Sequence, residues 1–331
     1  MEEILTAEEK AQLEFIEDKI RRIEDEREKL IESAQLRLLS EFDALKDKIV
    51  CVIGGKGGLG SIFLEIFAGT HSTRLAFAID QDNAHLAPEL LPHADLVIFA
   101  VPIHQTPELI AHYCQWIKPT AGICDITSIK TPAVEAMLAH HEGPVMGLHP
   151  MFGIATPSLN KQLIITCPGR DAAYFAPYIQ LWKILGARIV ETTAAKHDKI
   201  MTHMQAVRHF NTYLQGRFTA EQGFTLQELT DLSSPIYGLE LIMIGRLFAQ
   251  NPELYADIIY DNPESKEAMK KYLATASQAI AQLQEDNKAD FIENFGKTAE
   301  FFGDKADLFL YQSSLILQEA IKLKEIDDNR D

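Results

Sequence analysis

Between residues 49 and 191 the chain alternates short, almost continuously apolar runs with longer stretches of helical spacing. The apolar runs are rich in β-branched residues and fall at 49–53, 75–79, 95–101, 122–126, 145–148 and 162–166. Helix-length stretches lie between several of them, at 59–68, 107–116 and 132–141. Because strands that are buried on both faces read as unbroken apolar runs, this alternation predicts a doubly wound parallel sheet with helices on both sides.

From residue 192 onward the strand pattern is absent and helical spacing continues to the end of the chain. The predicted helices are 196–221, 226–250, 265–286, 288–302 and 305–325, with breaks at Gly223, Asn251-Pro252, Asn262-Pro263 and Gly303. Several of these helices, 239–248 in particular, are apolar on more than one face. Such helices are typical of a bundle core or a subunit interface.

Residues 1–48 contain neither glycine nor proline, and their apolar positions follow a heptad-like spacing at Leu13, Ile16, Ile20, Ile23 and Leu30. This pattern predicts one helix that packs on the rest of the protein or on a second subunit. The chain therefore divides into a helical extension (1–48), an α/β domain (49–191) and an all-helical domain (192–331).

A glycine-rich turn directly follows the first predicted strand and opens the first helix. Gly55, Gly57 and Gly60 form a G-x-G-x-x-G pattern, which Gly58 and Leu59 complete. In this context the first glycine permits a tight turn, the second lets a pyrophosphate approach the backbone, and the third allows close helix packing. Asp80 ends the second strand, 20 residues after Gly60, where an acid binds the ribose hydroxyl of NAD. Arg74 lies close in sequence, so NADP is disfavoured rather than excluded.

Groups able to react beside a nicotinamide follow the next three strands. We expect Val101 and Pro102 to line the cofactor, and His104, Ser128, Lys130 and His149 to converge on the same crevice at the carboxyl ends of the strands. An imidazole can accept the proton of an alcohol as hydride leaves. His149 is preferred because Gly147 and Pro150 restrict the backbone around it, and His104 comes too early in the sheet.

Arg246 lies in the almost entirely apolar stretch 239–249 of the helical part. A guanidinium in such surroundings needs a partner, which is either Glu240 or the carboxylate of a substrate. His197, His203 and His209 are spaced by six residues and do not share a helix face. We therefore expect no metal site there.

Composition narrows the class of protein. The 331 residues carry 48 acidic and 31 basic side chains and a formal charge of −17, which argues against a nucleic-acid or anionic-membrane partner. No apolar run reaches the length of a membrane span, and the charged N-terminus argues against a secretory signal. Four cysteines without close spacing argue against a zinc site or a redox pair. A cytoplasmic enzyme is expected.

Four strings resemble prephenate dehydrogenase, and in particular the dehydrogenase part of bacterial bifunctional chorismate mutase–prephenate dehydrogenases. They are MQAVRHF (204–210), LYADII (254–259), GLHPMFG (147–153) and LSSPIYGLELIMIGRLFAQ (232–250). The resemblance covers roughly 49–331. It implies a Rossmann-type domain, an all-α dimerisation domain that forms a homodimer, and NAD-dependent conversion of prephenate to 4-hydroxyphenylpyruvate and CO2 in tyrosine biosynthesis, with tyrosine feedback in many members.

The resemblance also implies a role for individual residues. His149 would deprotonate the C4 hydroxyl of prephenate, and Ser128 would bridge this histidine and the nicotinamide. Lys130 and His209 would belong to the substrate pocket, and Arg246 would bind the ring carboxylate.

Two departures and three alternatives accompany the resemblance. Residues 1–48 are about half as long as a chorismate mutase domain, so mutase activity is not expected, and Gly238 stands where the nearest relatives carry arginine. Arogenate, or both substrates, could replace prephenate. A regulatory protein that binds NAD without catalysis is an alternative of another class. A hydroxyacid dehydrogenase of the 6-phosphogluconate type ranks low, because it would use a lysine on a helix.

Overall fold

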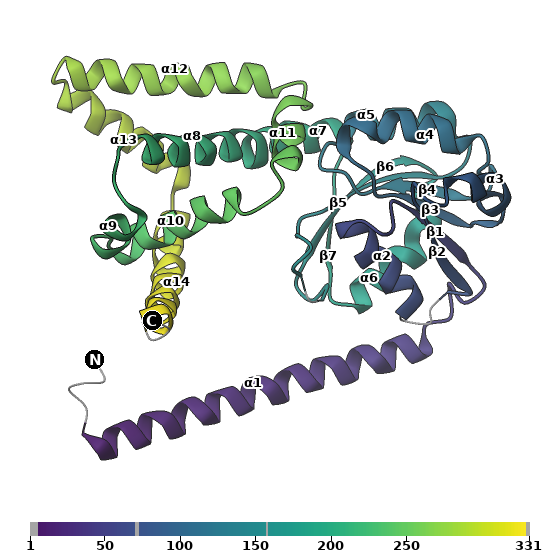
Figure 1. The fold of residues 1–331 in the computed structure, drawn as a ribbon, viewed down its shortest axis with the longest axis horizontal. Coiled ribbons are helices and arrows are strands. Elements are labelled where there is room, and N and C mark those ends of the chain that lie inside the picture. The colour runs from purple at the N-terminus through teal and green to yellow at the C-terminus, as the bar shows by residue number, and fades with distance from the viewer. Residues whose placement is uncertain (1–5, 70–72, 157, 329–331) are drawn as a thin grey trace. The chain divides into compact units, whose positions relative to one another are not determined.

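The computed structural model describes residues 6–69, 73–156 and 158–328 and divides into two compact units, Met1–His197 and Asp198–Asp331 (Figure 1). The first unit contains a seven-stranded sheet, and the second contains helices. This arrangement confirms the predicted fold class: a mainly parallel sheet preceded by a helix and followed by a helical domain. Within the described residues, no helix combines the length and the apolar character that a membrane crossing requires.

The sheet has the strand order β2-β1-β3-β4-β5-β6-β7. Its strands are β1 (Ile49–Ile53), β2 (Leu75–Ile79), β3 (Leu96–Phe99), β4 (Gly122–Asp125), β5 (Val145–Pro150), β6 (Leu163–Arg170) and β7 (Arg188–Glu191). Because β2 and β3 lie on opposite sides of β1, the chain reverses its direction across the sheet at β1. In doubly wound sheets this reversal opens the crevice in which ligands bind.

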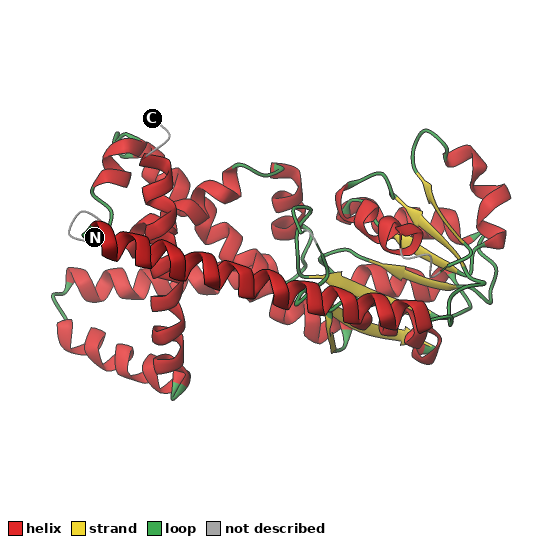
Figure 2. Ribbon diagram, turned by 90° about the horizontal axis from the view of Figure 1, so that it is seen from below, coloured by secondary structure: helices red, strands yellow, loops and turns green. Residues whose placement is uncertain are grey.

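Helices cover both faces of the sheet, as the yellow strands between red helices in Figure 2 illustrate. Consecutive residues of β1 alternate between the two sides: Val50 and Val52 pack with α2 (Gly58–Gly69) and α6 (Ala176–Ile184), and Cys51 and Ile53 pack with the helices of the opposite face. Those helices are α3 (Ala87–Leu90), α4 (Thr106–Cys114) and α5 (Thr131–His140). The unbroken apolar runs of the strands thus reflect burial on both sides.

Two features of the sheet differ from the prediction. The strand β6 runs antiparallel to β5, because the described residues of the connection 151–162 contain no helix such as a parallel crossover needs. The strand β7 was not predicted: it has only four residues, lies at the edge of the sheet and is largely exposed, so its sequence lacks the apolar run of a central strand.

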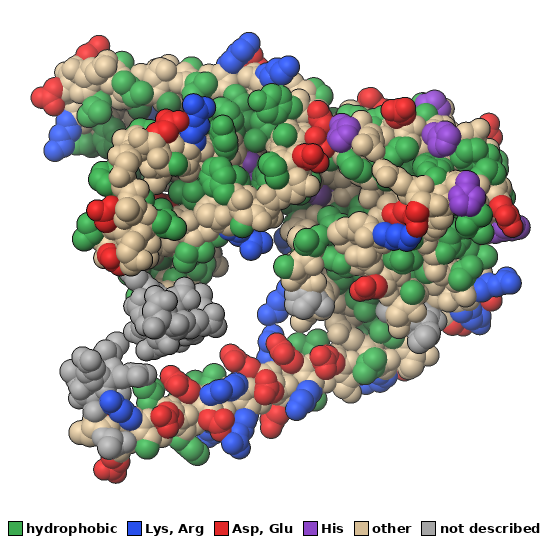
Figure 3. All heavy atoms as spheres, in the orientation of Figure 1, with side chains coloured by type: hydrophobic (Ala, Val, Ile, Leu, Met, Phe, Trp, Pro, Cys, Tyr) green, Lys and Arg blue, Asp and Glu red, His purple; other side chains and the backbone are tan. Residues whose placement is uncertain are grey.

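The N-terminal extension forms one helix, α1 (Ala7–Glu41), which begins with a capping box between Thr6 and Glu9. Only its end joins the core: Leu39 and the following Phe42 and Leu45 pack in the cluster around α6. The heptad-like residues further upstream are exposed, from 37 % at Leu13 to 72 % at Leu30. Charged side chains line much of this helix (Figure 3).

The helical unit consists of the end of α7 (Ala194–Met201), a π-helical segment (Thr202–Val207), α8 (Arg208–Glu221), α9 (Leu226–Asp231), α10 (Pro235–Phe248), α11 (Pro252–Tyr260), α12 (Ser265–Gln284), α13 (Lys288–Phe302) and α14 (Lys305–Asp328). The single helix predicted at 226–250 is wrong. It ends at Asp231 and restarts at Pro235, because a proline is accommodated in the first turn of a helix but not in its interior.

Candidate functional site

A tight glycine turn joins β1 to α2. Gly54 takes the left-handed conformation (φ 83°), donates its N–H to the Ile79 carbonyl at 2.8 Å and accepts the Gly57 N–H at 3.1 Å. The sequence motif predicts that Gly55 permits the tight turn, but the left-handed residue is Gly54, one position earlier. Gly55 instead makes room for β2, since a Cβ there would lie 2.7 Å from the Ala78 Cβ.

The start of α2 lies so close to this turn that no side chain fits between them. A Cβ on Gly60 would lie 2.2 Å from the Gly54 carbonyl oxygen. The first intrahelical bond runs from the Ser61 N–H to the Gly57 carbonyl at 2.8 Å, so the N–H groups of Gly58, Leu59 and Gly60 lie before it in the chain. Amides at this position of a helix have no intrahelical acceptor and form an anion site with the helix dipole.

Asp80 follows β2 and faces the same turn. Both of its carboxylate oxygens lie 3.3 Å from the Lys56 N–H, and its own N–H donates to the Asn83 side chain at 2.6 Å. Arg74 precedes the first residue of β2 and Asp80 follows its last, so the extended strand separates the two residues by roughly 20 Å. The nearby Lys56 amine is paired with Asp82 at 2.5 Å. An acid, rather than an arginine, therefore lies beside the glycine turn, at the position where the sequence predicts the ribose to bind.

These features fit a bound NAD. The glycine turn has space for a pyrophosphate only because side chains are absent there, the N-terminal amides of α2 suit its charge, and Asp80 suits a ribose diol. Val101 and Pro102 follow Ala100, whose carbonyl would lie 2.4 Å from a Cβ on Gly54. They therefore adjoin the turn, as expected for residues that line the cofactor.

Replacing Asp80 with serine should weaken NAD binding about 10- to 100-fold and improve NADP binding, because one charged hydrogen-bond acceptor and its repulsion of a 2′-phosphate are removed. The dissociation constants of both cofactors measure this directly. Asp82→Ser is the matched control, since Asp82 is an exposed acid of the same turn that pairs with the Lys56 side chain. An unchanged NAD-to-NADP preference in Asp80→Ser would contradict the assignment.

His149 lies near the end of β5, two residues beyond Gly147, and is 2 % exposed. Gly147 is level with Ile53 through the registers of β3 and β4, so His149 and the glycine turn lie at the same edge of the sheet. Three strand spacings, about 14 Å, separate β1 from β5. The Nδ1 atom of His149 lies 2.8 Å from Nε2 of His197, which is 1 % exposed and belongs to α7.

The segment after β4 contains a buried ion pair. The Lys130 amine, fully buried, bonds the equally buried Asp125 carboxylate and the Leu148 carbonyl, the latter at 2.5 Å. Asp125 also accepts the Thr127 N–H at 3.0 Å. Ser128, half-buried, lies between these residues in the loop. Lys130 thus holds the backbone next to His149, and a direct contact between Lys130 and substrate remains a prediction.

In the helical unit, Arg246 of α10 and His209 of α8 lie near one aromatic residue, Tyr255 of α11. The rings of His209 and Tyr255 are nearly perpendicular, in a T-shaped contact with centroids 4.8 Å apart. Burial raises the pKa of the Tyr255 hydroxyl, and the Arg246 charge opposes this shift. Burial, aided by the Arg208 charge, lowers the pKa of His209, so this ring is neutral at pH 7.

Arg246 is exposed and, among the residues that the structure describes, forms no ion pair with Glu240 or any other acid. The sequence left two partners open for Arg246, Glu240 or a substrate carboxylate. The described contacts do not include the pair with Glu240. His209 and Tyr255 line a cavity of about 310 Å³ together with Phe210, Tyr213, Leu247, Phe248, Gln250, Pro252, Ala256, Ile259 and Tyr260. Gly238 lies in the first turn of α10, where an added Cβ would meet only the Ser233 hydroxyl, at 3.3 Å.

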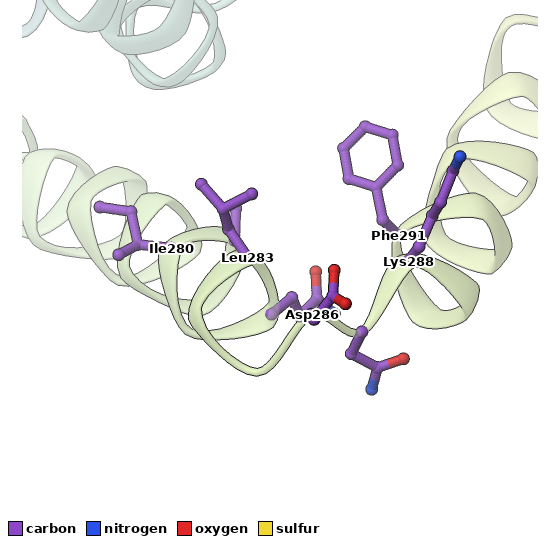
Figure 4. Close-up of a pocket in the computed structure, with 8 residues that line it drawn as sticks. Ile280, Leu283, Asp286, Lys288 and Phe291 are labelled. Atoms are coloured by element: carbon purple, nitrogen blue, oxygen red, sulfur yellow. The ribbon is translucent and has the colours of Figure 1, made fainter.

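A second hollow, of about 510 Å³, lies between α12 and α13. Ile280 and Leu283 of α12 and Phe291 of α13 point into the same space (Figure 4). None of the residues predicted to bind cofactor or substrate lines it. Its lining is mostly apolar, which is typical of a surface that meets protein rather than a charged metabolite.

The cysteines take no part in this chemistry. All four are buried, and none of them forms a disulfide within the described part of the chain. Burial, and secondarily the nearby Asp125, raises the pKa of the Cys124 thiol far above its usual range. Burial likewise raises the pKa of the Cys114 thiol to about 12. Neither sulfur is a thiolate at neutral pH, and thiols are poor nucleophiles.

Three residues of this region were missed from the sequence. Gly54 precedes the recognised motif and differs from it only in its backbone angle. Asp125 is the ion-pair partner of Lys130, which was predicted. An acid five residues before that lysine, at the end of a buried strand, could have suggested the pair. His197 is 48 residues from its partner His149, and no local pattern connects the two.

Comparison with known proteins accounts for both units. Residues 70–191 match the model of the prephenate dehydrogenase nucleotide-binding domain, and residues 193–297 match that of the prephenate dehydrogenase dimerization domain. The T-protein of Enterobacter agglomerans is 40 % identical over 274 residues, which cover 82 % of this chain and 72 % of that protein. The T-protein of Haemophilus influenzae is 38 % identical over 276 residues, which cover 83 % and 73 %.

A solved structure shares the fold. The crystal structure of prephenate dehydrogenase from A. aeolicus, in complex with hydroxyphenyl propionate and NAD+, aligns with a TM-score of 0.57 at 15 % identity. The alignment covers 78 % of this chain and 99 % of that one. The sequence resemblance is thereby confirmed at the level of both domains and of whole relatives. This chain belongs to the prephenate dehydrogenase family.

Proposed function

We propose that this protein is an oxidoreductase that converts prephenate and NAD+ to 4-hydroxyphenylpyruvate, CO2 and NADH in tyrosine biosynthesis. Family membership supports the reaction class. The observation that carries the assignment of the chemistry is the buried His149 at the end of β5, at the same sheet edge as a glycine turn fit for a dinucleotide. An imidazole there is placed to take a proton beside the nicotinamide.

Residues of this chain handle the proton of the reaction and hold the reacting groups in place. When bound, NAD supplies the acceptor for the hydride that leaves C4 of prephenate. His149 accepts the C4 hydroxyl proton as the ketone forms, and it can return a proton to the phenolate oxygen after the ring carboxylate leaves as CO2. Ser128, in the loop after β4, bridges the imidazole and the nicotinamide and so keeps the two groups in register. Loss of CO2 gives an aromatic ring, so the reaction proceeds in one direction.

Prephenate is a dianion, and this acidic protein therefore needs local positive charge to bind it. Arg246 and His209 are the two residues of the helical unit that we expect to bind substrate. Since His209 is neutral at pH 7, the positive charge of this pair comes from Arg246. An arginine can bond a carboxylate through two parallel N–H groups, which fixes the orientation of the ring as well as its position. The exposed guanidinium, without an ion pair among the described residues, is available for this task.

Arg246→Ala should raise the KM for prephenate about 10- to 100-fold, the usual value of a lost charged hydrogen bond, and leave the NAD dissociation constant unchanged. Steady-state kinetics with prephenate, together with NAD titration, measure the two effects. Arg217→Ala is the matched control, since it removes the same charge from an exposed helix where Arg217 pairs with Glu221 at 2.9 Å. Weaker NAD binding with an unchanged KM would contradict this division of tasks.

The assay that tests the proposal follows NADH formation by the full-length protein with prephenate and with arogenate in parallel. Turnover of prephenate supports the proposal, whereas turnover of arogenate alone would reassign the substrate. NAD binding without turnover of either compound would favour the regulatory alternative.

We also propose that the helical unit forms a homodimer in the cytoplasm. Its match to a dimerization domain supports this assembly, as do large exposed apolar side chains on α13 and α14, such as Phe295 (68 %), Phe301 (84 %) and Leu310 (68 %). Figure 3 shows apolar side chains over the visible face of this unit. Four cysteines that form no disulfide within the described residues suit a reducing compartment. Inhibition by tyrosine remains an expectation from the resemblance.

A further inference from the structure

Two histidines from distant parts of the chain form a hydrogen bond inside the first unit. His149 Nδ1 and His197 Nε2 lie 2.8 Å apart, and the ring planes meet at 66° with centroids 5.0 Å apart. Both side chains are almost fully buried, at 2 % and 1 % exposure. None of the roles derived above uses His197.

The bond restricts how the two rings can be protonated. A neutral imidazole has one N–H donor and one acceptor nitrogen, whereas an imidazolium has two donors. Two imidazolium rings would direct N–H groups at each other, so both rings cannot be charged while this bond exists. When both rings are neutral, one ring must donate and the other must accept.

Both partners are held by rigid elements, so the bond also fixes the orientation of the rings. The β5 backbone at His149 pairs with Ile165 of β6, and the preceding Leu148 carbonyl accepts the Lys130 amine at 2.5 Å. The His197 N–H donates to the Thr193 carbonyl at 2.8 Å in the first turn of α7. Rotation of either imidazole would therefore break a buried hydrogen bond, which is unfavourable.

We propose that His197 is a positioning residue that keeps His149 in its Nδ1-protonated form, with Nε2 as the nitrogen that accepts the substrate proton. This inference rests on the proposed function, because a base needs an unprotonated nitrogen directed at the substrate. His149 then donates its Nδ1–H to Nε2 of His197, which carries its own proton on Nδ1. The carboxylate of a serine protease triad controls its histidine in a comparable way.

Two substitutions separate positioning from packing. His197→Leu removes the acceptor at similar volume and should lower kcat about 10- to 1,000-fold, with an unchanged NAD dissociation constant. His197→Gln offers a carbonyl oxygen as acceptor and should retain kcat within about fivefold of wild type. His140→Gln, an exposed change at the end of α5, is the control for loss of a histidine. Full kcat in His197→Leu, or equal losses in both variants, would overturn the proposal.

A spectroscopic readout does not depend on turnover. The full-length protein, labelled with ¹⁵N at its 11 histidines, reports the protonated nitrogen of each ring by NMR, and the spectrum of His149→Gln identifies the His149 signals. At a pH where His149 is neutral, its proton should lie on Nδ1 in wild type and His197→Gln, and should distribute over both nitrogens in His197→Leu. A proton on Nε2 in wild type would overturn the proposal.

The two readouts also distinguish this inference from the function on which it rests. If wild type fails to oxidise prephenate, the proposed function is wrong, and the NMR spectrum still decides whether His197 controls the His149 ring. If His197→Leu does not fold, the wild-type and His197→Gln spectra decide the same question.

Discussion

His149→Asn should lower kcat for prephenate oxidation by about 10²- to 10⁴-fold, the range typical of a lost general base. Asparagine approximates the size of the imidazole and retains hydrogen-bonding groups, but it cannot accept a proton at neutral pH. The NAD dissociation constant should not change, because His149 lies at the end of β5, about 14 Å across the sheet from the glycine turn. Steady-state kinetics and NAD titration provide both values.

The control for His149→Asn is His141→Asn, which alters another buried histidine in the same unit. The ring of His141 is 4 % exposed and bonds the Ala121 carbonyl at 2.8 Å, so its loss should affect stability more than kcat. Burial lowers the pKa of His141, which indicates a neutral structural ring. Unchanged kcat in His149→Asn would remove this histidine from the mechanism and return attention to His104.

Lys130→Met should lower the free energy of unfolding by about 3–5 kcal/mol, because it leaves the Asp125 carboxylate charged, fully buried and without its ion-pair partner. One oxygen of that carboxylate, Oδ1, already has no hydrogen-bond partner among the described residues. Urea unfolding at neutral pH measures the loss. The double variant Asp125→Asn/Lys130→Met should recover most of it, because both charges are then removed and the amide oxygen can still accept from Thr127.

An exposed ion pair serves as the control for the buried pair of Lys130 and Asp125. Lys297 pairs with Glu293 at 2.6 Å on α13, with both side chains 64 % exposed, so Lys297→Met should change the free energy of unfolding far less than Lys130→Met. Equal effects of Lys130→Met and Lys297→Met would show that the buried pair does not hold the loop. A raised KM with unchanged stability in Lys130→Met would instead support the contact with substrate that the resemblance implies.

Local patterns predicted the elements of the first unit well. The run 49–53 coincides with β1, since a strand buried on both faces must be apolar at every position, and the run 75–79 coincides with the edge strand β2. Local patterns also pointed to the glycine motif, the acid at the end of β2 and the histidine at the end of β5. Their positions relative to a strand end depend on a few neighbouring residues.

The errors occur where short segments leave a weak pattern. The strand β7 is a four-residue edge strand, and the break between α9 and α10 depends on one proline. The antiparallel direction of β6 follows from the length of a connection rather than from the strand itself. Moving the glycine turn from Gly55 to Gly54 required a backbone angle, which adjacent glycines do not reveal.

The fold class and the family could be predicted from the sequence and are confirmed, whereas the roles of Asp80 and His149 stay predictions that its motifs favour. The folded chain was needed to see that Arg74 lies at the far end of β2 from Asp80, that Lys130 is buried against Asp125, and that His197 bonds His149. The physical reason is the range of the interactions. Backbone turns and strand burial are encoded over a few residues, whereas the protonation and orientation of a side chain depend on atoms that folding brings from 48 residues away.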